Sequence, residues 1–234
     1  MRYVLFLCVV LFCGAVASAD YLHVGNNNPA TEGWKLITGT PGYAQEDYWV
    51  TDTYGYARWE PVVKPTVDDF LGDWMLTVEA RWVAGPKAES RCTIFDGYRG
   101  FSTALTWDAG SAYYYQKTLA DTPFVGVDPT QWNLYQIWYR PESQAIEFYV
   151  NGTLMDSLEP ARQNVIAQDS YLLYWGDNNS QQPPNQNHSI MHWRRVEFLR
   201  DGIMPAMVPE PATVVMLLAL AACGVLFWVL RRIR

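Results

Sequence analysis

Short alternating segments separated by turn residues constrain the fold of this 234-residue chain more than any other feature. Between Trp74 and Trp82 every second residue is apolar, which is the period of a strand with one buried face. Sustained helical periodicity occurs only at the two ends of the chain. The pattern therefore predicts an all-β fold, an antiparallel jelly-roll sandwich. Further strands are predicted at 34–38, 48–51, 56–59, 91–95, 101–107, 112–117, 132–140, 145–150, 153–157, 171–175 and 189–199.

Turn residues separate these segments at short intervals. Asn151-Gly152 lies between two extended runs, and this dipeptide is the strongest short signal for a hairpin. Pro141 to Gln144 separates the preceding pair of runs in the same way. The segment from 132 to 157 is therefore predicted to form three consecutive antiparallel strands.

The C-terminal end has a different character. Pro209-Glu210-Pro211 precedes 19 uncharged apolar residues, 212–230, and three of the last four residues are arginines. As a helix this run is about 28 Å long, close to the thickness of a bilayer core. The order resembles the PEP-CTERM sorting signal, which implies recognition by a bacterial exosortase, retention in the membrane and cleavage near Pro209, Glu210 and Pro211. A plain single-pass anchor is the alternative.

The N-terminal end carries the signs of a secretory leader. A positive start at Met1-Arg2 and a short apolar run precede Ala17-Ser18-Ala19, a small-x-small cleavage site for signal peptidase. We therefore expect a signal peptide at 1–19, one domain at 20–202, a linker at 203–207 and the sorting segment at 208–234, with a transmembrane helix at 212–230. The protein is expected to be exported, held in the membrane by this helix, and placed at the cell surface or in the extracellular matrix after processing.

Charge and cysteine content narrow the classes of partner. Between the two end segments the chain has 13 basic and 23 acidic side chains, a net charge of −10. With no basic cluster, this body is not expected to bind nucleic acid. Cys92 is the only cysteine outside the end segments, so no disulfide forms within the domain, and Cys92 is predicted to be a buried core thiol.

A second resemblance covers roughly residues 70 to 202. The hairpin from Trp132 to Gly152, which contains Tyr149-Val150-Asn151-Gly152, is similar to the hairpin of the laminin G-like and concanavalin A-like lectin/glucanase domains. The runs 171–176 and 193–198 are similar to the closing strands of that family. The resemblance implies a jelly roll of the concanavalin A type and a polysaccharide ligand.

Seven residues are candidates for glycan binding. If the hairpin packs as the family's does, alternate residues of the strands point away from the core, and aromatic faces beside polar groups suit the C–H faces and hydroxyls of sugars. Cross-strand pairs that only stabilise the sheet are the alternative interpretation. The candidates are Glu79, Arg81, Gln136, Trp138, Arg140, Glu147 and Tyr149.

Catalysis and metal binding have weaker signals. Laminarinase-type relatives carry Glu-x-Asp-x-x-Glu on one strand, and that motif is absent, so we expect no enzyme of that type. Calcium is an expected ion because many relatives bind it, and Asp96, Asp108 and Asp177 offer oxygen ligands, although turn chemistry also explains these residues. The predicted function is glycan binding or a structural role in the envelope or matrix. A divergent glycoside hydrolase or polysaccharide lyase and a protein–protein adhesion module are the alternatives.

Overall fold

A computed structural model describes most of the predicted domain. The chain divides into two units after Gly202, and every described residue belongs to the first. Within that part of the chain, no helix combines the length and apolar character needed to span a membrane. The predicted leader, linker, sorting segment and helix 212–230 lie outside the described residues. These residues are 21–54, 56–84, 90–97, 100–103, 113–116, 119–158, 171–178 and 188–200.

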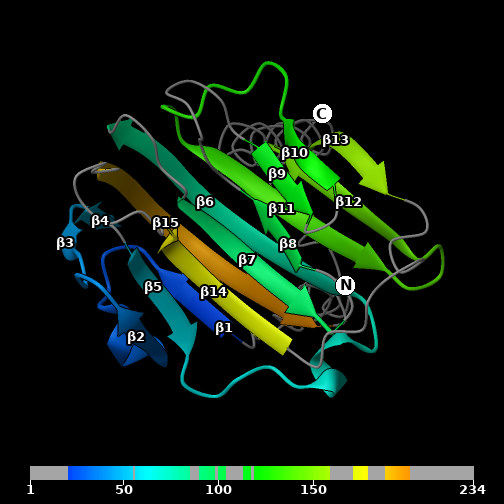
Figure 1. Ribbon diagram of the computed structural model, residues 1–234, viewed down its shortest axis with the longest axis horizontal. Coiled ribbons are helices and arrows are strands. Elements are labelled where there is room, and N and C mark those ends of the chain that lie inside the picture. The colour runs from blue at the N-terminus through cyan, green and yellow to red at the C-terminus, as the bar shows by residue number, and fades with distance from the viewer. Residues whose placement is uncertain are drawn as a thin grey trace, which may run out of the picture. The chain divides into compact units, whose positions relative to one another are not determined.

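Two antiparallel sheets face each other (Figure 1). Sheet A has the strand order β13-β12-β11-β6-β15-β4-β3, and β1 also pairs with β15. Its strands are β1 (Tyr21–Val24), β3 (Tyr43–Gln45), β4 (Tyr48–Tyr54), β6 (Trp74–Ala84), β11 (Asn133–Arg140), β12 (Ala145–Val150), β13 (Thr153–Leu158) and β15 (His188–Arg200).

Sheet B has the order β10-β9-β8-β7-β14-β5-β2. Two short 3-10 helices lie in connections, η1 (Pro29–Glu32) before β2 and η2 (Val67–Phe70) before β6. The strands of sheet B are β2 (Trp34–Thr38), β5 (Tyr56–Pro61), β7 (Ser90–Asp96), β8 (Gly100–Thr103), β9 (Tyr113–Gln116), β10 (Leu119–Pro123) and β14 (Tyr171–Asn178). The jelly-roll prediction of an all-β sandwich is confirmed.

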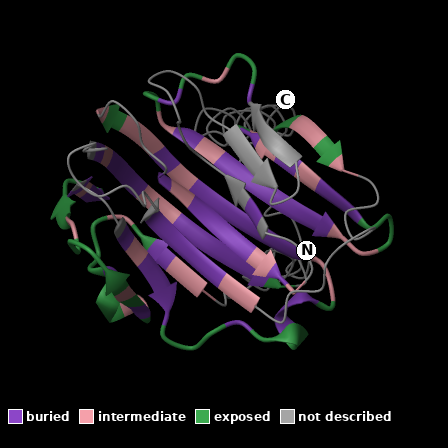
Figure 2. Ribbon diagram, viewed as in Figure 1, coloured by how far each residue is buried: buried purple, intermediate pink, exposed green. Residues whose placement is uncertain are grey.

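Tryptophans hold the two sheets together. Trp175 of sheet B lies 5.3 Å from Trp193 of sheet A, measured between ring centroids. Trp59 stacks on the same Trp175 ring at 6.0 Å, and Trp34 meets it edge-on at 5.9 Å. Most residues of the central strands are buried, whereas exposed residues lie mainly in the turns and at the edges of the sheets (Figure 2). Cys92 is fully buried in this core, and burial raises the pKa of its thiol, as expected of an inert core residue.

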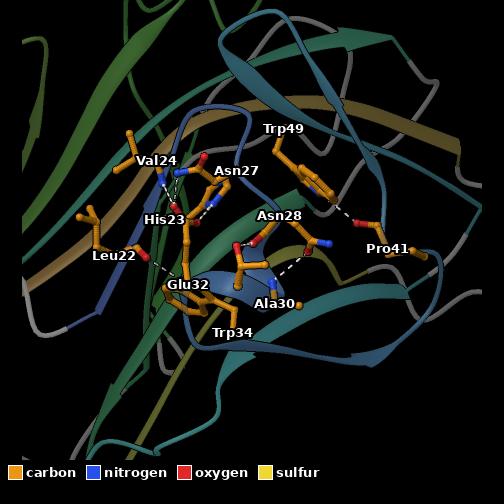
Figure 3. A network of polar contacts seen from close by, with 11 residues as sticks. Leu22, His23, Val24, Asn27, Asn28, Ala30, Glu32, Trp34, Pro41 and Trp49 are labelled. Atoms are coloured by element: carbon orange, nitrogen blue, oxygen red, sulfur yellow. Dashed lines mark hydrogen bonds and ion pairs between the residues drawn. The ribbon is translucent and has the colours of Figure 1, made fainter.

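A polar network fixes the N-terminal strand to the sandwich (Figure 3). The Glu32 carboxylate accepts hydrogen bonds from His23 Nδ1 at 2.6 Å, from Asn27 Nδ2 at 2.8 Å and from the Val24 amide at 3.2 Å. The His23 ring is fully buried and stacks on Trp175 at 4.8 Å. Burial acts to raise the pKa of Glu32, but these hydrogen bonds and the nearby His23 charge outweigh it and hold the pKa below its ordinary value.

The structure agrees with the predicted strands in most places and adds three. β1, β3 and β10 were not predicted, because they are only three to five residues long and lack clear alternation. Asn151 and Gly152 both have positive φ, 51° and 77°, as the predicted Asn-Gly hairpin requires. The predicted alternation of the central hairpin is observed, because the residues that alternate with its outward candidates lie in the core: Tyr135, Ile137, Tyr139, Ile146, Phe148 and Val150.

Replacing Glu32 by Gln is expected to lower the free energy of unfolding at neutral pH by about 1–3 kcal/mol, since a partly buried charge-assisted network is lost. The folded state holds the pKa of Glu32 below 4.5, so this stabilisation is present above that pH and is lost as the pH falls through the lowered value. Denaturant titrations across this range measure the effect. Glu142→Gln, at an exposed turn position, is the control. A constant difference between wild type and Glu32→Gln at every pH would contradict the account.

Gly176→Ala is expected to destabilise the sandwich by about 3 kcal/mol or more, because strain and overpacking act together. Gly176 has φ +117°, and an added Cβ would lie 2.0 Å from the carbonyl oxygen of Ala57 on β5. Gly126→Ala is the matched control, with φ +80° and no atom within 4 Å of the added Cβ, so only about 1–2 kcal/mol of backbone strain is expected. Thermal unfolding distinguishes the two, and equal losses would show that the close approach to Ala57 is unimportant.

Candidate functional site

The outer face of sheet A carries all seven candidate residues. On β6, Val78 and Ala80 lie in the core, so Glu79 and Arg81 between and beside them point away from it. The same alternation on β11 and β12 directs the other five outward: Gln136, Trp138, Arg140, Glu147 and Tyr149. The candidates nevertheless divide into two groups, with Gln136 apart from both.

The first group is a closed network on β11 and β12. Glu147 Oε2 accepts hydrogen bonds from Arg140 Nε at 2.8 Å and from the Tyr149 hydroxyl at 2.7 Å. Burial, together with the Glu147 carboxylate, raises the pKa of Tyr149, so the phenol keeps the proton that it donates. The Arg140 guanidinium lies 3.6 Å from the centre of the Trp138 ring, and Trp138 is only 9% exposed. One face of Trp138 is therefore already occupied.

Gln136 is separate from this network. Its side-chain amide approaches Met75 Sδ at 3.6 Å, a weak contact, and Gln136 is buried. This contact runs diagonally between β11 and β6, because the register places Gln136 opposite Thr77, two residues after Met75.

The second group surrounds Trp132, and we call it the Trp132 cluster: Tyr48, Arg81, Trp132, His192 and Arg194. The guanidinium carbons of Arg194 and Arg81 lie 3.9 Å and 4.8 Å from the centre of the Trp132 ring. Tyr48 lies 5.6 Å from Trp132 and stacks on His192 at 4.2 Å. The cluster joins β4, β6, β15 and the loop before β11.

A β-bulge brings Arg194 to this cluster. On β15, Trp193 pairs with Ala80 and Arg195 pairs with Glu79, so Arg194 is the extra residue between them. Arg194 Nη1 contacts Glu79 Oε1 at 2.7 Å, and its Nε lies 3.0 Å from Asp47 Oδ2. Glu79 thus lies beside the cluster as an ion-pair partner of Arg194. A ligand that contacted the Glu79 carboxylate would therefore also meet the positive charge of Arg194.

Arg81 differs from Arg194 because it has no carboxylate partner among the described residues. Its Nε and Nη2 lie 3.2 Å and 3.1 Å from His192 Nδ1. Burial and the Arg81 charge lower the pKa of His192 to about 4. The ring is therefore neutral at ordinary pH, and since an arginine can only donate, Nδ1 is the acceptor and Nε2 carries the proton. Within the described part of the chain, no acidic side chain compensates the charge of the Arg81 guanidinium.

A pocket of about 450 Å³ adjoins the cluster, and Trp132 lines it too. The loop before β11 and the β12–β13 turn form its walls. Asn133 Nδ2 fixes the loop by donating to the carbonyl oxygens of Asp128 at 2.7 Å and Gln131 at 2.9 Å. Asn151 Nδ2 donates to Asn133 Oδ1 at 2.9 Å and ties the turn to the loop. The polar lining side chains include Asp128, Gln131, Asn151 and Thr153.

The predicted calcium ligands do not come together where they are described. Asp96 lies opposite Tyr171 and Asp177 lies opposite Ser90, at the two ends of the β7–β14 pair. Six residues of strand separate them, about 20 Å, so one ion cannot bind both. No group of three His, Cys, Asp or Glu side chains suited to a metal occurs among the described residues. Asp108 lies outside them, and calcium binding stays a prediction.

The processing residues also lie outside the described part of the chain: Ala17, Ala19, Pro209, Glu210 and Pro211. Sequence reasoning missed most of the Trp132 cluster, namely Tyr48, Trp132, His192 and Arg194. His192 lies between the apolar residues Met191 and Trp193, and strand alternation then indicates that its side chain points outward. No signal in the sequence could have paired His192 with Arg81, because that contact depends on which strands are neighbours.

Arg81→Met is expected to raise the pKa of His192 from about 4 toward its ordinary value of 6.5, because the repulsive charge is removed while much of the burial stays. The ring-proton shifts of His192 followed by NMR against pH measure this change. Arg140→Met removes a charge from the same sheet in the other group and should leave His192 unchanged. An unaltered titration in Arg81→Met would mean that burial alone sets the value.

Comparison with known proteins identifies the tail and the fold. Residues 208–233 match the PEP-CTERM protein-sorting motif. The structure is similar to Crh5 transglycosylase in complex with NAG, at TM-score 0.60 and 13% identity over 80% of this chain and 86% of that one. No curated protein matches the chain in sequence.

Two further solved structures have the same fold. One comes from work on endo-acting O-glycanases of the human gut microbiota, at TM-score 0.55 and 11% identity over 79% of this chain and all (100%) of that one. The other is the Emp47p carbohydrate recognition domain, at TM-score 0.51 and 11% identity over 79% and 96%. At such identities the likeness establishes architecture only. The chain therefore carries a PEP-CTERM protein-sorting motif behind a β-sandwich of the concanavalin A-like lectin and glycosidase fold.

Proposed function

We propose that the chain is an exported bacterial surface protein whose sandwich binds a polysaccharide in the pocket beside Trp132. The sorting motif at 208–233 supports export and processing by an exosortase, with signal peptidase removing residues 1–19 and helix 212–230 holding the precursor in the membrane. The fold shared with a carbohydrate recognition domain and with an enzyme bound to NAG supports a glycan as the ligand.

The observation that carries the proposal is an aromatic side chain at the wall of a pocket that has both apolar and polar lining residues. A volume of about 450 Å³ lies within the range of small-ligand sites. The Trp132 ring offers a face for sugar C–H groups, and Asp128, Gln131 and Thr153 offer partners for hydroxyls. Arg81 beside the ring adds guanidinium donors. Hydrogen bonds from Asn133 and Asn151 hold these walls in place before a ligand arrives, which lowers the entropic cost of binding.

The Trp138 group is the second candidate surface. It has the aromatic and charged side chains that a glycan needs, but its polar atoms already bond to one another. A ligand would have to displace Arg140 from the Trp138 ring. Arg81 and Arg194 lie over the Trp132 ring as well, but Trp132 also lines a pocket of about 450 Å³ that has space for a ligand, so we favour the pocket.

Binding without catalysis fits the described carboxylates better than hydrolysis. A retaining glycosidase needs two carboxyl groups about 5 Å apart that face the substrate, one of them protonated. Asp47 and Glu79 are brought together, but each contacts the Arg194 guanidinium. Both carboxylates are therefore engaged with Arg194, which is not the arrangement of an acid and a nucleophile that face a substrate.

Trp132→Ala is expected to weaken polysaccharide binding by about tenfold, the loss of one stacking contact of roughly 1.4 kcal/mol. Polysaccharide pull-down and a glycan array with the purified full chain, with and without calcium, provide the measurement. Tyr43→Ala removes an aromatic ring that is 50% exposed on β3 and serves as the control.

A second variant protects the test from an effect on folding. Gln131→Ala combined with Thr153→Ala changes two exposed pocket positions and should also weaken binding while leaving the thermal midpoint unchanged. The proposal is wrong if the wild-type protein binds no glycan, or if both pocket variants bind as wild type does.

A further inference from the structure

Both ends of the domain leave from one end of the sandwich. β1 and β15 are antiparallel, with Tyr21 opposite Phe198, so the strand that follows the predicted leader begins where the last strand finishes. Arg200, the last residue of β15, pairs with Trp74, the first residue of β6. We call this the terminal end of the sandwich. The β11–β12 turn lies at the same end, since Tyr139 pairs with Trp74.

Chain length keeps the sorting segment near this end. Eight residue steps join Arg200 to Val208, and even fully extended they span at most about 28 Å. The 13 residues of β15 cover about 40 Å from one end of the sandwich to the other. The start of the sorting segment therefore cannot reach the far end of the sheet.

An exposed apolar segment occurs at the terminal end. We call residues 62–71, which join β5 to β6, the apolar loop (Figure 2). Its Val62, Val63, Val67 and Leu71 are 62%, 74%, 47% and 66% exposed. Such a concentration of exposed aliphatic side chains in ten residues is typical of an interaction surface.

Two contacts hold the apolar loop against the terminal end. The Phe70 ring is buried between Trp74, at 6.0 Å, and Phe198, at 5.5 Å. Asp69 Oδ1 lies 3.0 Å from Nη1 of Arg200. Arg200 is the last described residue before the predicted linker. The loop is therefore fixed beside the point at which the chain leaves the sandwich.

We propose that the apolar loop lies on the bilayer surface while the C-terminal helix holds the protein in the membrane. This inference rests on the export and anchoring proposed above. Anchoring confines the terminal end to within a linker's length of the lipid, where exposed aliphatic side chains gain from leaving water. With Lys64 and Asp68 both exposed, the loop has no basic excess. Neutral headgroups are therefore its partner, and anionic lipids are not required.

The pocket then projects away from the membrane. Asn133, at its base, pairs with Ala80, and seven residues of β11 separate it from Arg140 at the terminal end. This distance is about 23 Å along the strand. The Trp132 pocket would thus be open to extracellular polysaccharide before the tail is cut, whereas the Arg140–Glu147 network would lie near the lipid.

The test uses the full chain in phosphatidylcholine vesicles. Cys223→Ser removes the thiol of the predicted anchor, Cys8→Ser and Cys13→Ser remove those of the predicted leader, and Cys92 is buried. A fluorescent label at Ser143→Cys, in the exposed β11–β12 turn, or at Gln131→Cys, by the pocket, reports energy transfer to a headgroup dye. Flotation of the vesicles measures anchoring separately. We expect severalfold stronger transfer from residue 143 than from residue 131.

Paired surface variants then test the apolar loop. Val62→Ser, Val63→Ser and Leu71→Ser together should reduce the difference in transfer, whereas Val125→Ser with Leu154→Ser, also exposed and at the pocket end, should not. Equal transfer from both labels on floated vesicles would overturn this inference alone. An unchanged difference in the triple variant would exclude lipid as the partner of the loop. Failure to float would contradict the proposed anchoring and this inference with it, while glycan binding is judged by its own assay.

Discussion

The pairing of β6 with β15 is the contact on which the rest of the molecule depends. It is the longest ladder in sheet A, from Ile190 opposite Ala84 to Arg200 opposite Trp74. Its inward residues, including Trp193, supply the surface on which Trp175 and the other tryptophans of sheet B pack. With no disulfide available within the domain, stability depends on this aromatic layer.

The same ladder creates the candidate site. Its bulge at Arg194 adds one residue on the outer face, and that residue joins Glu79 and Asp47 to the Trp132 ring. Bulges often redirect side chains at functional sites. Here the bulge supplies a second guanidinium beside an aromatic ring, while the partner of Arg81 is the neutral His192 ring, with no acid beside Arg81 among the residues that the structure describes. The β6–β15 pair thus packs the core with its inner face and carries the candidate site on its outer face.

Local pattern was enough to predict the sandwich, the Asn-Gly hairpin and the inward and outward residues of β6, β11 and β12, because strand alternation is a property of neighbouring residues. The site required more. Trp132 meets Arg81, Tyr48 and His192 through pairings between segments far apart in the sequence, and the register of β15 includes a bulge that no local pattern shows. For the same reason Asp96 and Asp177 seemed compatible as ligands until the register placed them at opposite ends of the β7–β14 pair.

The position of β15 has a consequence for biogenesis. This strand is central in its sheet, yet it is the last to be synthesised, and one of its neighbours is the first strand of the domain. The strand pairing of sheet A therefore cannot be complete until the chain has been synthesised as far as Arg200, even if earlier strands have already packed together. Under the proposed export, this strand order would keep the sandwich incomplete until nearly the whole body has been synthesised, because the central pairing of sheet A needs the residues up to Arg200.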